Sequence, residues 1–155
     1  MTTVRTILLV EDDPNEIFLA QRAFNKANIN VSLQIISDGD SAVAYLDGTE
    51  EYADRELYPL PKLILLDLKL PCRSGHEILA WVRQNPLLKL LPVVIFTSSR
   101  EPADVNLAYE LGANSYLVKP NGLKALTKMV ETLSLYWLVD NEPPEVIPLT
   151  KKSKI

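Results

Sequence analysis

Short apolar runs alternate along this chain with segments whose apolar residues recur at every third or fourth position. The short runs are typical of buried strands, and the second pattern is typical of one face of a helix. Five runs are predicted as strands, at residues 6–10, 31–36, 63–67, 92–97 and 115–118. A helix is predicted after each strand, from Pro14 through Ala27, from the turn at 37–40 to Gly48, and at 75–85, 103–111 and 123–138.

The strict alternation of strand and helix defines the expected fold. Strands that are apolar on both faces and linked by helices form a parallel sheet, and right-handed crossovers distribute the helices over both faces. We therefore expect an α/β fold, a doubly wound five-stranded parallel sheet with strand order 2-1-3-4-5. The domain is expected to cover residues 5–138, with a surface loop at 49–61 and an extended, proline-containing tail at 139–155.

Composition narrows the class of protein. The 155 residues are 47% apolar and 23% charged, which suits a single soluble domain. The net charge of -4 argues against a nucleic-acid partner, and the tail lysines 151, 152 and 154 are too few to change this. Cys72 is the only cysteine, and no apolar run has the length of a signal peptide or membrane span. A cytoplasmic protein with no membrane partner is expected.

Polar side chains stand where four of the five predicted strands end. In chain order these residues are Glu11, Asp12 and Asp13, then Asp67, then Thr97 and Ser98, and finally Lys119. Ligands of an open parallel sheet bind beyond the carboxyl ends of its strands, at the point where the strand order reverses. We therefore expect these side chains to converge at one edge of the sheet.

These residue types indicate phosphoryl chemistry with a metal ion. Clustered carboxylates need a cation, and oxygen ligands without His or Cys favour Mg²⁺. A carboxylate such as Asp67 can attack phosphorus and form an acyl phosphate. Mg²⁺ and Lys119 would then neutralise the phosphoryl oxygens, and the hydroxyl of Thr97 would donate a hydrogen bond to one of them.

Each of these residues also has an ordinary structural explanation. An acidic run such as 11–13 often precedes a helix, where it stabilises the first turn. Asp67 could cap a turn, and Lys119-Pro120 is a common loop dipeptide. The residues are specific only as an ordered set in which each member stands at a strand end.

Four stretches carry this set, and together they resemble the signatures of response-regulator receiver domains. They read ILLVEDDP at 7–14, LILLDLKLP followed by Ser74-Gly75 at 63–75, VVIFTSS at 93–99 and ANSYLVKP at 113–120. The resemblance covers roughly residues 5–138 and implies the flavodoxin-like, CheY-like (βα)5 fold. It also implies a signalling switch and not an enzyme, since such a domain catalyses only its own phosphorylation and dephosphorylation.

The resemblance assigns roles to the acidic residues. Asp67 would be the phosphoacceptor and Asp12 the main Mg²⁺ ligand. Glu11 would hold the metal through water, and the backbone carbonyl of Lys69 would complete the protein ligands, which include Asp67 itself.

The remaining matched residues would form the switch. Thr97 and Lys119 would bind the phosphoryl group, and the Lys119–Pro120 bond would be cis. A histidine kinase would donate the phosphoryl group, Thr97 would move toward it, and Tyr116 would turn into the space left behind. This shift between pre-existing states would change the face formed by the fourth helix, fifth strand and fifth helix.

A narrower resemblance is to the small stand-alone regulators that partner cyanobacterial and bacterial phytochromes. It is carried by the acidic insertion at 49–61 and by Tyr136-Trp137 near the end of the last predicted helix. It implies a phytochrome kinase as partner and a homodimer as the assembly. Ser98 departs from the commonest receiver pattern, in which Ala often follows the threonine, but serine is small enough to leave room for a phosphoryl group.

Three other classes of function, and one alternative within the leading class, are open to test. A phosphatase with an aspartyl nucleophile would carry a second Asp two positions after Asp67, where this chain has Lys69. A nucleotide-binding protein would need a glycine-rich phosphate loop, whereas the five glycines here are scattered singly. A pseudo-receiver that no longer takes phosphate is disfavoured by the intact residue set, and a role as shuttle between kinases and phosphotransfer proteins stays open.

Overall fold

The structure, a computed structural model, describes residues 4–146 and contains the five strands and five helices expected from the sequence. All neighbouring strands are parallel, in the order β2-β1-β3-β4-β5, so the predicted α/β fold and strand order are confirmed. The strands are β1 Arg5–Val10, β2 Val31–Ile36, β3 Leu63–Leu66, β4 Val93–Thr97 and β5 Ser115–Val118. The helices are α1 Pro14–Ala27, α2 Gly39–Asp47, α3 Gly75–Gln84, α4 Pro102–Glu110 and α5 Leu123–Ser134.

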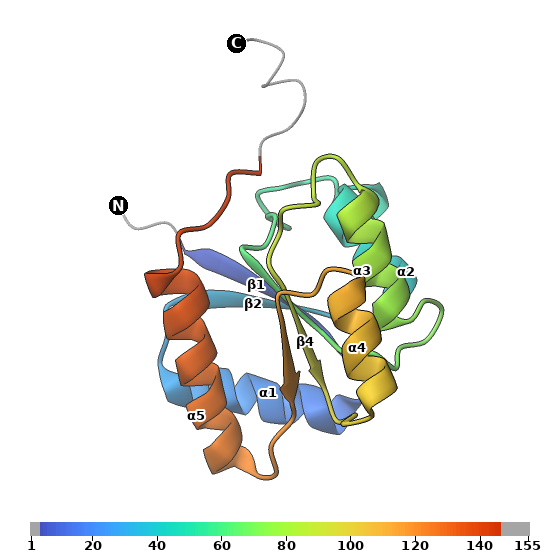
Figure 1. Ribbon diagram of the computed structural model, residues 1–155. Helices are drawn as coiled ribbons and strands as arrows, with labels where there is room; N and C mark the ends of the chain where they lie inside the picture. The colour runs from blue at the N-terminus through green and yellow to red at the C-terminus, as the bar shows by residue number, and fades with distance from the viewer. Residues whose placement is uncertain (1–3, 147–155) are drawn as a thin grey trace.

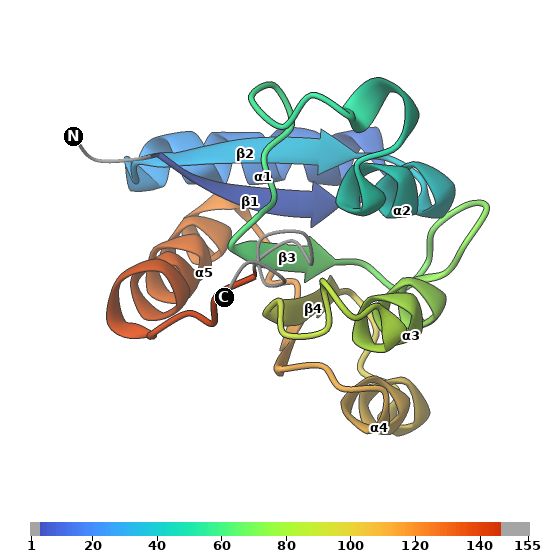
Figure 2. The same ribbon diagram turned by 90° about the horizontal axis from the view of Figure 1, so that it is seen from above.

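The helices form two layers, one on each face of the sheet (Figures 1 and 2). Helices α1 and α5 lie on one face, and α2, α3 and α4 lie on the other. Successive residues of β1 face opposite layers, so Leu8 and Val10 pack with α2 and α3 while Ile7 and Leu9 pack with α1 and α5. Strands buried on both faces explain why their sequences are continuous apolar runs. None of the helices within residues 4–146 is long and apolar enough to cross a membrane.

The register of the strands determines what emerges at the edge of the sheet. Val10 pairs with Leu66, and each is the last residue of its strand. The residues that follow, Glu11 and Asp67, therefore leave the sheet side by side. On the far side of β3, Thr97 at the end of β4 pairs with Val118 at the end of β5.

The predicted surface loop at 49–61 contains regular structure and is hydrogen-bonded to the preceding helix. It contains a single 3₁₀ turn, η1 Glu50–Tyr52, and Arg55 holds it against α2. The Arg55 guanidinium donates to the carbonyls of Tyr45 and Leu46 at 2.8 and 2.9 Å and to that of Tyr58 at 3.1 Å. Two of these carbonyls lie in the last turn of α2, where a cation is favourable. The loop is therefore fixed to the helix that precedes it.

The predicted last helix changes geometry before it ends. The segment Leu123–Ser134 is α-helical, and η2 Leu135–Asp140 is a π-helix, which widens the turn. Residues 141–146 then cross to the opposite face, where Val146 packs against the core beneath α2 and α3. The rest of the predicted tail, including Pro148 and the lysines at 151, 152 and 154, lies outside the described residues.

Candidate functional site

Backbone hydrogen bonds extend the sheet by one residue at the edge where the candidate side chains stand. Asp67 N–H donates to the carbonyl of Val10 at 3.1 Å, so the Asp67 carboxylate follows β3 directly and lies beside the end of β1. Lys119 N–H donates to the carbonyl of Thr97 at 2.8 Å, which attaches Lys119 to the end of β4. Residues from distant parts of the sequence thus project their side chains from the same edge of the sheet, as the sequence analysis predicted.

Three carboxylates gather there. Glu11, Asp12 and Asp67 each offer one oxygen within 4.8 Å of the other two. Glu11 is 3% exposed and Asp67 is 9% exposed, whereas Asp12 is open to solvent. Two of the acidic side chains are therefore largely removed from water, and burying a charge is unfavourable unless it is paired.

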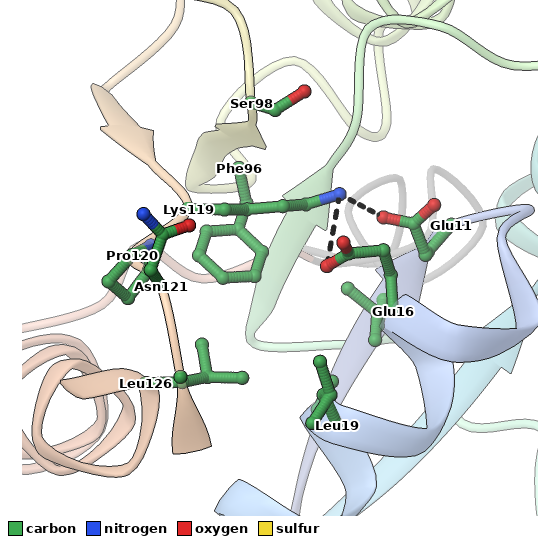
Figure 3. A pocket seen from close by; sticks show the side chains of 12 residues that line it. Glu11, Glu16, Leu19, Phe96, Ser98, Lys119, Pro120, Asn121 and Leu126 are labelled. Atoms are coloured by element: carbon green, nitrogen blue, oxygen red, sulfur yellow. Dashed lines mark hydrogen bonds and ion pairs between the residues drawn. The ribbon is translucent and has the colours of Figure 1, made fainter. Parts of the chain in front are cut away.

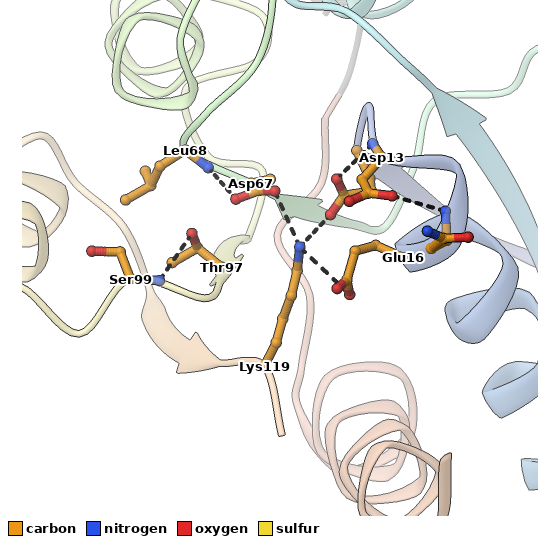
Figure 4. A network of polar contacts seen from close by, with 9 residues as sticks. Asp13, Glu16, Asp67, Leu68, Thr97, Ser99 and Lys119 are labelled. Carbon is orange, nitrogen blue, oxygen red and sulfur yellow. Dashed lines mark hydrogen bonds and ion pairs between the residues drawn. The ribbon is translucent and has the colours of Figure 1, made fainter. Parts of the chain in front are cut away.

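Lys119 supplies the pairing (Figure 4). Its Nζ lies 3.1 Å from Asp67 Oδ2 and also donates to Glu11 Oε1. The side chain of Lys119 is only 10% exposed, so this ammonium is itself largely buried between the carboxylates. One cation therefore holds the ends of β1 and β3 to the end of β5.

Burial and ion pairing shift the pKa values of Glu11 and Lys119 in opposite directions. Burial raises the pKa of the Glu11 carboxyl, and its hydrogen bonds from Lys119 and the Asp13 amide oppose that shift without cancelling it. Burial alone would lower the pKa of Lys119. The hydrogen bond to Glu11 and the negative charges of Asp67 and Glu11 outweigh burial, so the pKa of Lys119 is raised and the ammonium stays charged.

The donor set fits a divalent cation. Three carboxylates against one ammonium leave two negative charges uncompensated at the end of the sheet. All the candidate ligand atoms are oxygens, which suit a hard ion such as Mg²⁺. Lys69, the fourth predicted ligand, lies in the β3–α3 loop with its side chain exposed, and the role of its carbonyl stays a prediction.

The Asp67 carboxylate has a fixed orientation. Its Oδ1 accepts from the Leu68 amide at 2.7 Å, which leaves Oδ2 directed at Lys119. The following loop returns closely to the same strand end, where the Gly75 amide donates to the Leu68 carbonyl at 2.9 Å. A Cβ at position 75 would lie 2.1 Å from the carbonyl oxygen of Asp67, so only glycine fits there. The glycine of the Ser74-Gly75 pair is thereby explained by packing.

Thr97 and Tyr116 lie on the α4 side of the site. Thr97 is 2% exposed, and its Oγ1 accepts from the Ser99 amide at 3.4 Å. Within residues 4–146, the Thr97 hydroxyl forms no hydrogen bond with Asp67 or with the Lys119 ammonium. The Tyr116 hydroxyl donates to the Ser99 carbonyl at 2.9 Å, and burial raises the pKa of Tyr116. Both candidate switch residues are therefore joined through one residue of the β4–α4 loop.

That linking residue was not singled out by the sequence analysis. Besides its contacts with Thr97 and Tyr116, Ser99 donates from its Oγ to Asp104 Oδ2 at 2.5 Å, in the first turn of α4. The carbonyl of Asp104 in turn lies 3.2 Å from His76 Nε2 on α3. A second serine after the β4 threonine is a weak sequence signal, because small polar residues are common in loops.

One expectation about this region is wrong. The Lys119–Pro120 peptide bond is trans, like every other peptide bond within residues 4–146. The trans form is the more stable form of an X–Pro bond by about 0.5–1 kcal/mol. Lys119 reaches both Glu11 and Asp67 from this trans backbone.

A small cavity adjoins Lys119 on the α1 side (Figure 3). It has a volume of about 160 Å³ and lies between α1, the end of β4 and the β5–α5 loop. Glu16, in the first turn of α1, points into it, with Oε2 3.9 Å from Lys119 Nζ. The sequence analysis did not select Glu16, although its position five residues after Glu11 places it near the same edge.

Comparison with known proteins identifies the family. Residues 7–131 match the model of the response regulator receiver domain. The chain belongs to this family. It is 45% identical over 134 residues to the response regulator Rcp1 of Synechocystis, an alignment that covers 86% of this chain and 89% of the relative.

Solved structures of receiver proteins have the same fold. The phosphorylated cyanobacterial phytochrome response regulator RcpA is 35% identical, with a TM-score of 0.85 and coverage of 92% of this chain and 100% of that one. The Mn²⁺-bound form of Rcp1 is 43% identical, with a TM-score of 0.80 and coverage of 91% and 99%. The chain is thus a receiver-domain response regulator whose relatives include phytochrome-linked proteins and a protein with a bound divalent metal.

Proposed function

We propose that this protein is a phosphorylatable switch of a two-component pathway, in which a histidine kinase transfers a phosphoryl group to Asp67 in the presence of Mg²⁺. The observation that carries the proposal is the orientation of Asp67, whose Oδ2 faces the Lys119 ammonium while its Oδ1 is held by the backbone. A fixed carboxylate beside a cation and two further carboxylates is the arrangement that an in-line attack on phosphorus requires.

The transfer itself is a simple displacement. A carboxylate oxygen of Asp67 attacks phosphorus of a phosphohistidine, the new O–P bond forms, and the N–P bond breaks with its electron pair staying on the imidazole. Hydrolysis reverses the switch, since water attacks the same phosphorus, the O–P bond to Asp67 breaks, and inorganic phosphate leaves. Lys119 stabilises the negative charge of the phosphoryl oxygens in both steps, and Thr97 donates a hydrogen bond to one of them.

The metal would be held by Glu11, Asp12 and Asp67, together with the backbone carbonyl of Lys69. When bound, Mg²⁺ supplies the positive charge that the phosphoryl oxygens need and that Lys119 alone does not provide. The two uncompensated negative charges of the carboxylate cluster support a divalent ion here. The choice of Mg²⁺ over other divalent ions follows from its suitability for carboxylates with retained waters.

The output would pass through the face formed by α4, β5 and α5. Thr97 and Tyr116 both contact Ser99, which continues into α4 through Asp104, so a movement of Thr97 toward a phosphoryl group would be felt at that helix. Exposed apolar residues at the end of this face support a homodimer; they are Leu135, Tyr136 and Val139. Apolar and aromatic side chains of this kind are enriched at protein interfaces.

The names of the relatives suggest the donor. One neighbour is a phytochrome response regulator and others are bacteriophytochrome response regulators, so we propose a phytochrome kinase as partner. The receiver domain is proposed to extend over residues 5–138, with the tail at 139–155, and a cytoplasmic location stays a prediction from the sequence.

Incubation with acetyl phosphate and Mg²⁺, followed by intact-mass measurement, tests the proposal. The wild type is expected to gain one phosphoryl group, and the gain should disappear with EDTA or in Asp67→Asn. Absence of any gain under all conditions would favour the pseudo-receiver. A phosphatase, by contrast, would release inorganic phosphate from many monoesters without accumulating a modified chain.

A further inference from the structure

Glu16 stands where a helix-capping residue is expected, but it does not cap. In a capping box, the acid at the third helical position accepts a hydrogen bond from the N–H of the N-cap residue. Here the N-cap residue of α1 is Asp13, and its N–H donates to Glu11 Oε2 at 3.0 Å. Within residues 4–146, the Glu16 side chain forms no hydrogen bond of its own.

The same fold contains the normal case for comparison. In α3, Ser74 is the N-cap residue and Glu77 occupies the third position, and both hydrogen bonds of the capping box are present. Glu16 and Glu77 therefore have the same residue type and the same helical position. They differ in what the carboxylate faces.

The Glu16 carboxylate faces Lys119. Its Oε2 lies 3.9 Å from Lys119 Nζ across the small cavity beside α1 (Figures 3 and 4). Glu16 is 40% exposed, whereas Lys119 and Glu11 are almost fully buried. An ammonium has three N–H donors. Two serve Glu11 and Asp67, and Glu16 is the third carboxylate within 4.0 Å of Lys119 Nζ among the described residues.

We infer that Glu16 is a positioning residue for Lys119. The Glu16 carboxylate holds the Lys119 ammonium toward α1 and competes with an incoming phosphoryl group for that ammonium. The inference rests on the proposed phosphorylation of Asp67 and names a residue that regulates its rate. Removing the charge of Glu16 removes its electrostatic attraction on the Lys119 ammonium and lowers the repulsion of an anionic phosphodonor. Both effects act in the same direction, toward faster phosphorylation.

The size of the effect follows from the partial exposure of Glu16. A half-exposed ion pair at this distance changes a rate by about two- to fivefold at low salt. Because the Debye length falls to about 3 Å at about 1 M salt, the effect should then largely disappear. A packing contribution of Glu16 to α1 would lack this salt dependence, and its interaction with the helix dipole, which salt also screens, is matched in the Glu77→Gln control.

The test measures the rate constant of phosphorylation by acetyl phosphate at saturating Mg²⁺, at low and at high salt. The variants are Glu16→Gln, the matched control Glu77→Gln and the charge-retaining Glu16→Asp. Both Gln variants lose one negative charge from the first turn of a helix, so changes in net charge and helix dipole cancel in the comparison. Thermal unfolding of each variant verifies that it is folded.

The inference predicts that Glu16→Gln is phosphorylated about two- to fivefold faster than the wild type at low salt. This ratio should fall toward one at high salt. Glu77→Gln and Glu16→Asp should stay close to the wild-type rate. A Glu16→Gln rate equal to or below that of the wild type would overturn it, as would an equal acceleration in Glu77→Gln. If the wild type itself takes up no phosphoryl group, the proposed function fails, which is a different result from an unchanged ratio.

Discussion

The ammonium nitrogen of Lys119 lies 3.1 Å from Oδ2 of Asp67, a contact that joins the end of β5 to the end of β3 across the intervening β4. The same ammonium reaches Glu11 after β1. The residues that the proposed chemistry needs are therefore also a structural unit, in which one cation compensates two nearly buried acids. This relationship makes the stability of the fold and the chemistry of the site depend on the same side chains.

Replacing Lys119 with Met should destabilise the metal-free protein by about 3 kcal/mol at neutral pH, because Glu11 is then left as a nearly buried charge without its partner. Urea unfolding in EDTA measures this change. Adding Glu11→Gln should recover most of the loss, because a neutral amide needs no counter-charge. Additive losses in the double variant would contradict the pairing.

Gly75→Ala should disturb the site more than an ordinary loop substitution, because its Cβ would lie 2.1 Å from the Asp67 carbonyl oxygen. We expect a loss of about 2–4 kcal/mol in urea unfolding, together with slower phosphorylation as the acceptor is displaced. Gly122→Ala is the control: it has a positive φ of 89° but no neighbour within 4 Å of the added Cβ. It should lose about 1–3 kcal/mol from backbone strain alone, and an equal slowing of phosphorylation in both variants would show that crowding at Asp67 is unimportant.

Tyr116→Phe removes the hydrogen bond to the Ser99 carbonyl and leaves that carbonyl without its side-chain donor. The expected loss of stability is about 1 kcal/mol, measured by chemical unfolding of the unphosphorylated protein. Tyr109→Phe on α4 serves as control, since Tyr109 is half exposed and should tolerate loss of its hydroxyl. If the proposed output face is correct, Tyr116→Phe also changes the difference in dimer affinity between the phosphorylated and unphosphorylated states. Tyr109→Phe leaves the hydrogen bond from Tyr116 to the Ser99 carbonyl intact.

Tyr45 predicts an alkaline limit to stability. It is fully buried and donates from its hydroxyl to the Pro59 carbonyl at 2.7 Å, and burial raises its pKa from 10.0 to about 12. The folded state therefore holds this proton more tightly than the unfolded state, so the stabilisation is complete below pH 10 and is lost as the pH rises from about 10 to about 12. The difference amounts to about 2–3 kcal/mol.

Tyrosinate absorbance and urea unfolding, both recorded against pH, check the Tyr45 prediction. In Tyr45→Phe the late tyrosinate transition should be missing, and the fall in stability over this pH range should be smaller. If the amplitude lost in that variant is instead missing from the transition at about pH 10, Tyr45 ionises like an exposed tyrosine.

The sequence was sufficient to predict the sheet and the convergence of the strand-end residues, because both follow from period and order alone. Apolar runs fix which residues are strands, and a parallel sheet brings every strand's carboxyl end to the same edge. The placement of Glu11, Asp67 and Lys119 follows from these two facts. Side-chain packing determines which carboxylates the Lys119 ammonium contacts, so its pairing with both Glu11 and Asp67 was not predictable from the sequence.

The features that the sequence did not predict depend on side-chain and backbone geometry that residue patterns do not specify. The pattern from Asp13 to Glu16 is that of a capping box, and only the position of Glu11 Oε2 shows that the capping bond goes elsewhere. Likewise, nothing in the loop at 49–61 indicates that Arg55 binds the end of α2. The trans bond at Lys119–Pro120 differs from the family expectation, and local sequence contains no signal for either isomer.

The most direct test of the central claim is to locate the phosphoryl group chemically. Borohydride reduction after treatment with acetyl phosphate and Mg²⁺ converts an aspartyl phosphate to homoserine, and peptide mass spectrometry then identifies the position. The account predicts homoserine at Asp67 only, in samples that contained both the phosphodonor and Mg²⁺. Homoserine at Asp12 or Asp13, or its absence from a protein that has gained phosphoryl mass, would contradict it.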